Sequence, residues 1–144
     1  MATKSGYVDV SPSDASCPLG IEVWIDQQQV FNCEHLITTE TVRFDFEEDD
    51  GEHELRVVLK NKLPEHTKID AAGEIVKDAV INVNNFVFEE ITVDQSVKEQ
   101  AIYYHNFNGS AEHIQDEFYG IMGCNGTLSL KFSTPIYIWL LENM

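Results

Sequence analysis

The 144-residue sequence is poor in basic residues and in long apolar runs, and each shortage excludes a class of protein. Nine Lys and Arg residues stand against 25 Asp and Glu residues, which gives a formal net charge of −16. A surface of this charge repels phosphate backbones and anionic lipid headgroups, so we expect neither nucleic-acid binding nor membrane-surface binding. No run of about 18 apolar residues occurs, so the sequence offers no candidate transmembrane helix.

Cysteine is scarce and widely spaced. The three cysteines, Cys17, Cys33 and Cys124, form no CxxC pair, and their odd number does not suit a disulfide framework. The N-terminus leads into polar residues and lacks the apolar core of a signal peptide. We therefore expect a protein with reduced thiols that is made in the cytoplasm without a signal peptide.

Catalytic motifs are also missing. The five histidines show no HExxH or comparable ligand spacing, and no Gly-rich phosphate loop is present. Carboxylates are so abundant that no single Asp or Glu is informative as a glycosidase acid or base. The acidic run 47–52 offers the oxygen ligands that calcium takes, but it lacks the spaced order of an EF-hand and is more typical of an acidic hairpin tip. We expect no enzymatic activity.

Alternation with a period of two is what the sequence has in abundance. In residues 41–47, for example, Val42, Phe44 and Phe46 fall on one face and charged residues on the other. Turn signals recur about every ten residues, and Asn125-Gly126 is the strongest hairpin signal. Some eight to ten short strands are indicated. The pattern predicts an all-β protein, with residues 1–144 forming a single two-sheet antiparallel β-sandwich of the jelly-roll type.

Four passages depart from clear alternation. Residues 62–77 contain Pro64 and Gly73 and predict a loop or a ragged hairpin. Residues 94–100 are typical of a polar linker, and residues 110–119 are compatible with one short helical turn. The apolar run 136–141 predicts a last strand that ties the C-terminus into a sheet.

Two sets of side chains are candidates for ligand contacts. Asn82 and Asn84 share one face of the strand 78–88, because side chains alternate along a strand. That polar face is either a binding surface or plain solvent-exposed surface. Trp24 lies on the face opposite Ile21 and Val23, so its ring belongs either to a second packed layer or to a surface on which a sugar stacks.

Residues 53–88 carry a recognisable arrangement: an alternating strand that ends at Asn61, a polar loop, and then Asp78 opening a second strand. This passage resembles the calcium-dependent xylan-binding type of carbohydrate-binding module. The resemblance implies a β-sandwich in which a calcium ion bound to a loop coordinates sugar hydroxyls, with Asn61 and Asp78 as its ligands. Lys62 stands where that family commonly has an Asp.

The resemblance leads us to expect a non-enzymatic carbohydrate-binding module that contacts a glycan. Its ligand-binding residues would be Trp24, Asn61, Asp78, Asn82 and Asn84. The whole chain also resembles small proteins of tailed bacteriophages, notably those of cyanobacteria, which implies a virion or host-interaction protein. The alternative is a structural decoration subunit of a virus particle. Such a subunit would bind copies of itself, as a homo-oligomer, or other virion proteins, without sugar or metal.

Overall fold

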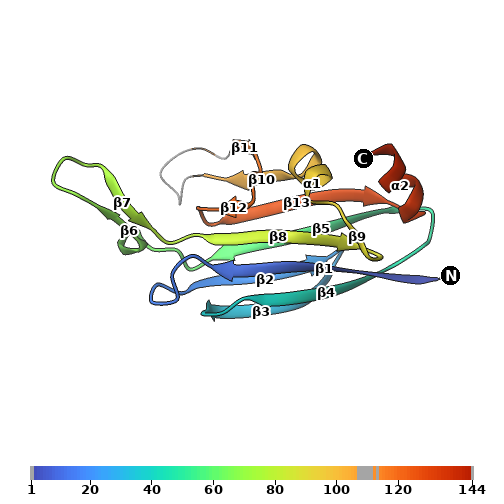
Figure 1. Cartoon of the computed structure of the whole chain (residues 1–144), viewed down its shortest axis with the longest axis horizontal. Coiled ribbons are helices and arrows are strands. Elements are labelled where there is room, and N and C mark those ends of the chain that lie inside the picture. Colours follow the sequence, from blue (N-terminus) through green and yellow to red (C-terminus); the bar gives the residue numbers. More distant parts are fainter. Residues whose placement is uncertain (1, 107–111, 113, 144) are drawn as a thin grey trace.

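The computed structural model describes residues 2–106, 112 and 114–143, and two antiparallel sheets form the body of the protein (Figure 1). In the first sheet the strand order is β12-β8-β1-β4. The short strand β9 also pairs with β8, at the end of β8 opposite to β12. Its strands are β1 (Thr3–Pro12), β4 (Glu40–Glu47), β8 (Ile81–Phe88), β9 (Ile91–Thr92) and β12 (Ile121–Met122).

The second sheet has the order β11-β10-β13-β5-β2-β3. Its strands are β2 (Leu19–Ile25), β3 (Gln28–Leu36), β5 (Glu52–Lys60), β10 (Ile102–His105), β11 (Ile114–Glu117) and β13 (Gly126–Ser133). A separate hairpin of β6 (Thr67–Ile69) and β7 (Ile75–Asp78), preceded by the 3-10 turn η1 (Pro64–His66), projects from one end of the sandwich (Figure 1).

The core lies between the two sheets, because each sheet turns one set of alternating side chains inward. In β4 the buried residues are Val42, Phe44 and Phe46, with exposed residues between them. Phe132 of β13 packs on this sheet, with ring centroids 5.0 Å from Phe46 and 4.9 Å from Phe88. The two-sheet antiparallel β-sandwich predicted from alternation is therefore confirmed, and so is the ragged hairpin in residues 62–77.

The predicted last strand is wrong, because residues 136–141 belong to the helix α2 (Ile136–Glu142). The buried positions are Ile136, Trp139 and Leu140, which is the spacing of a helix face and not of a strand. The backbone N–H of Ile136 donates to the carboxylate of Glu48, at 3.0 Å from Oε1, so the β4–β5 turn provides an acceptor at the start of the helix. A short run that is apolar throughout shows neither the helix period of 3.6 residues nor the strand period of two. Tertiary contacts therefore decide whether it forms a helix or a strand.

The predicted polar linker is also wrong, since residues 94–100 form the helix α1 (Asp94–Gln100). Val93, Val97 and Ala101 are spaced four apart and are all buried, so this helix docks along one narrow stripe. No helix in the described ranges is long and apolar enough to cross a membrane.

The Asn125-Gly126 hairpin was predicted in error, because β12 and β13 lie in different sheets and the dipeptide carries the chain across the sandwich. The Asn125 side chain accepts a hydrogen bond from the Lys62 backbone N–H and donates one to the Lys62 carbonyl, both at 2.9 Å. The helical turn predicted for residues 110–119 is partly wrong, since residues 114–117 form β11; its beginning at Ser110 falls outside the described residues.

Candidate functional site

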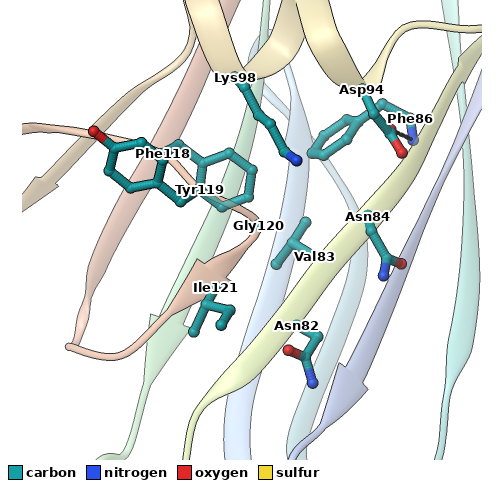
Figure 2. Close-up of a pocket in the computed structure, with 10 residues that line it drawn as sticks. All are labelled: Asn82, Val83, Asn84, Phe86, Asp94, Lys98, Phe118, Tyr119, Gly120 and Ile121. Atoms are coloured by element: carbon teal, nitrogen blue, oxygen red, sulfur yellow. Dashed lines mark hydrogen bonds between the residues drawn. The ribbon is translucent and has the colours of Figure 1, made fainter.

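A cavity of about 260 Å³ opens at the outer edge of β8, between this strand, α1 and the segment 118–121 (Figure 2). It lies where the pairing of β8 is interrupted. On this edge, β12 pairs with Ile81 and Asn82 at one end of β8, and β9 pairs with Val87 and Phe88 at the other. The lining residues are Asn82, Val83, Asn84, Phe86, Asp94, Lys98, Phe118, Tyr119, Gly120 and Ile121.

Where β8 has no neighbouring strand on this edge, its backbone forms hydrogen bonds with residues outside strands. The carboxylate of Asp94, at the start of α1, accepts the backbone N–H of Phe86 at 2.6 Å and that of Asn85 at 3.2 Å. Val93 donates to the Phe86 carbonyl at 2.8 Å, and Val83 donates to the Gly120 carbonyl at 2.9 Å. These bonds attach the start of α1 and the segment at Gly120 to the edge of β8, and the cavity lies between them.

A β-bulge shapes the β8 wall of the cavity. The register of β1 against β8 shifts between Tyr7 and Asp9, and Asn85 has a φ of 53°. Asn84 and Asn85 are both exposed in consequence, and the next residue, Phe86, returns to the core. The amide of Asn85 donates to the Asp9 carboxylate at 2.7 Å, which fixes the bulge to β1.

Asn82 and Asn84 are the two predicted site residues that the structure brings together. Both line the cavity, Asn82 half-buried and Asn84 exposed. Neither side-chain amide has a hydrogen-bond partner among the described residues. Each amide therefore has a free carbonyl oxygen to accept and a free NH₂ group to donate.

The helix and the opposite segment add a cation and a ring. Lys98 of α1 extends its ammonium toward the cavity (Figure 2), and no ion pair to it is formed within the described residues. Phe118 is buried against the edge of the Phe86 ring, at 6.2 Å between centroids, and this anchors the neighbouring Tyr119, whose side chain is 70% exposed. The Tyr119 hydroxyl donates to Glu117, and this hydrogen bond raises the pKa of the phenol.

Trp24 does not line this cavity and lies on the outer face of the other sheet. Its indole N–H donates to Glu22 at 2.8 Å, and the Arg56 guanidinium lies over the ring at 5.3 Å from its centroid. Glu22 in turn has a lowered pKa, first because of the bond from Trp24 and then because of its bonds with Lys60. The ring is thus already covered on one side by a cation.

Asn61 and Asp78 lie apart from the cavity and have separate partners. Asn61, at a φ of 67° just after β5, donates its amide to Glu34 at 3.0 Å. Asp78 accepts from the Thr67 hydroxyl and from the Lys62 ammonium, both at 2.7 Å. No group of three or more His, Cys, Asp or Glu residues in the described part of the chain is placed to hold a metal ion. A cation site shared by Asn61 and Asp78 does not fit this arrangement, because an ammonium already lies on Asp78.

In the acidic run 47–52, Asp49 also has protein partners. In the turn between β4 and β5, Asp49 accepts from His53 and from the backbone N–H of Gly51.

Sequence reasoning did not assign Lys98 to the site because residues 94–100 were interpreted as a linker. The four-residue spacing of Val93, Val97 and Ala101 was the signal that could have placed Lys98 on a helix.

No protein-family profile matches the sequence, and neither does any curated protein. Two solved structures resemble the fold. One is described as vCBM60 in complex with galactobiose: it is 15% identical, covers 88% of this chain and 96% of its own, and has a TM-score of 0.49. The other is a selenomethionine form of vCBM60, from work linking two families of calcium-dependent carbohydrate-binding modules by circular permutation. It is 13% identical, covers 88% of this chain and 89% of its own, and has a TM-score of 0.52. At this identity the likeness extends to the β-sandwich fold.

Proposed function

We propose that this protein is a non-catalytic glycan-binding module and that the cavity at the edge of β8 is its binding site. The observation that carries the proposal is a combination around one cavity: the amides of Asn82 and Asn84 and the Lys98 ammonium, which have no partner among the described residues, together with an exposed tyrosine ring. The fold likeness to a calcium-dependent carbohydrate-binding module supports the same class of function.

The chemistry of the lining suits sugar hydroxyls. Each amide donates to one hydroxyl oxygen and accepts from another, and Lys98 donates up to three hydrogen bonds. The Tyr119 ring offers a flat apolar face of the kind on which the C–H face of a pyranose packs. The volume of about 260 Å³ is just below the ~300 Å³ at which typical small-molecule sites begin, which suits a single sugar ring.

A longer glycan has room to continue past Lys98. This side chain also lines a second hollow of about 580 Å³, bounded by α1 and β11. Its acidic lining residues Glu99, Asp116 and Glu117 are hydrogen-bond acceptors for further hydroxyls. We therefore expect an oligosaccharide to bind more tightly than its monosaccharide.

Within the β8 cavity, the described lining offers no pair of carboxyl groups for hydrolysis. Glycosidases place two carboxyl groups on either side of the scissile bond. Among the described residues, Asp94 is the single carboxylate in the lining of the β8 cavity, and both of its oxygens accept backbone N–H groups. It therefore has a structural role at the strand edge.

The experiment is a glycan-array screen of the purified protein, followed by calorimetric titration of the best oligosaccharide. Asn84→Ala and Tyr119→Ala should each weaken binding about tenfold or more, which corresponds to roughly 1.4 kcal/mol. Gln27→Ala, an exposed amide in the β2–β3 turn, is the matched control and should bind like the wild type. Equal affinity of all variants would place the glycan elsewhere, and the absence of any glycan ligand at millimolar concentration would refute the function.

A second candidate, assembly with copies of the same chain, is favoured by the hairpin of β6 and β7. Ile69, Ile75 and Val76 on this hairpin are 62%, 65% and 64% exposed, and the hairpin projects from the sandwich (Figure 1). Analytical ultracentrifugation at micromolar concentration tests this candidate: Ile75→Ser should abolish a dimer, and a monomeric wild type would refute it.

A further inference from the structure

Lys62 carries the most deeply buried ammonium group among the ion pairs of the structure. Its side chain is 2% exposed, and Nζ lies 2.7 Å from Asp78 Oδ1. The same ammonium donates to the carbonyl oxygen of Gly123. A buried charge is costly unless it is paired and hydrogen-bonded, so this pocket of acceptors is built around the lysine.

The acceptors come from segments that no strand pairing joins to one another. Asp78 closes the projecting hairpin and is held by Thr67 of β6 at 2.7 Å. Gly123 lies on the crossing between β12 and β13. Lys62 itself follows β5, and its backbone is clamped on both sides by the Asn125 amide at 2.9 Å. One ammonium therefore joins the end of β5, the hairpin and the inter-sheet crossing.

Calcium does not fit beside this lysine. The ion takes six to eight oxygen ligands at about 2.3–2.6 Å. Among the described residues, the oxygens bonded in this cluster belong to the Asp78 carboxylate, the Gly123 carbonyl and the Thr67 hydroxyl, and the first two groups already accept from Lys62. Asn61, the other residue for which the family resemblance implies a calcium ligand, has its amide on Glu34 instead.

We propose that the Lys62 ammonium is the cation that holds this loop cluster together, and that the cluster needs no bound calcium. The end of β5, the hairpin and the crossing are then held together without calcium. This inference concerns the loops and their stability, and it stands independently of the glycan site.

The first test is thermal unfolding in millimolar calcium and in chelator. The wild-type midpoint should be the same in both, within about 1 °C. A rise with calcium that magnesium does not reproduce would overturn the proposal, because a bound ion stabilises the folded state by mass action. This measurement needs no variant.

The second test removes the charge and keeps the length of the side chain. Lys62→Met should lower the midpoint by about 4 °C or more, because it leaves the Asp78 carboxylate without its cation. Lys68→Met, at an exposed position of β6, is the control and should leave the midpoint unchanged. Equal midpoints for the two variants would overturn the proposal.

A third measurement on the wild type applies if Lys62→Met does not fold. Reductive methylation followed by peptide mass spectrometry compares the native reactivity of the two lysines. Lys68 should be modified quickly and Lys62 at least tenfold more slowly, because its ammonium is enclosed by acceptors. Modification of both at the same rate would show that Lys62 does not hold the cluster.

Discussion

His53 makes the stability of this protein depend on pH in a way that can be worked out from the contacts. The His53 side chain is 7% exposed, and its two ring nitrogens lie 2.7 Å from Asp26 Oδ2 and 2.9 Å from Asp49 Oδ1. Both nitrogens must donate to satisfy both carboxylates, which only the protonated ring does. Burial lowers the pKa of His53, but the hydrogen bonds with Asp26 and Asp49 outweigh burial and raise it above its ordinary value.

The sign of the effect follows from linkage. Because the pKa is raised in the folded state, the stabilisation is fully present below the unfolded value of about 6.5 and is lost as pH rises through the folded value. Hydrogen bonds to charged groups contribute about 1.5–3 kcal/mol. The side chains of Asp26 and Asp49 are 43% and 37% exposed, so solvent reduces the net contribution, which we put at about 1–2 kcal/mol for the pair.

The assay is urea denaturation of the wild type and His53→Gln at pH values from 6 to 9. At pH 6 the variant should be less stable by about 1–2 kcal/mol, and its free energy of unfolding should change less with pH than that of the wild type. His35→Gln, at an exposed histidine, should follow the wild type. A wild-type stability that does not fall above pH 6.5, or a variant with the wild-type slope, would refute the reasoning.

Three other perturbations test the packing. Phe132→Ala removes the ring that joins the aromatic side chains of both sheets and should cost about 3–5 kcal/mol in urea denaturation, with a loss of near-UV circular dichroism. Gly6→Ala places a Cβ atom 2.5 Å from the Phe44 ring and should cost about 1–3 kcal/mol by the same assay; a neutral effect would contradict the close approach of β1 and β4. Burial raises the pKa of Tyr103, so an absorbance titration to pH 11 should leave this phenol protonated, and Tyr103→Phe should cost about 1–3 kcal/mol because the Cys124 N–H loses its acceptor.

The strands could be predicted because burial and the two-residue period agree in them. Val42, Phe44 and Phe46 needed no knowledge of their neighbours, since one face of a sandwich strand is always buried. The helix α2 could not be predicted in this way. Its apolar residues fit a strand equally well, and its docking depends on Glu48, which is distant in sequence.

The candidate site was predictable only where it belongs to a single strand. Asn82 and Asn84 share a face by alternation, and the structure places both at the cavity. Lys98 lines the cavity from the helix α1. Tyr119 lines it from the segment between β11 and β12, which is distant from β8 in the sequence. Their approach depends on the bulge at Asn85 and on the bonds of Asp94, which are tertiary features that no local pattern reports.

The bonds of Asp94 have a consequence for aggregation. A sheet edge with free N–H groups is a template on which another chain can add as a strand. Through its carboxylate, Asp94 occupies the N–H groups of Asn85 and Phe86, so an extended segment finds no donors at the interrupted part of β8. The residue thus protects the protein from strand addition there and leaves the cavity beside the edge unfilled.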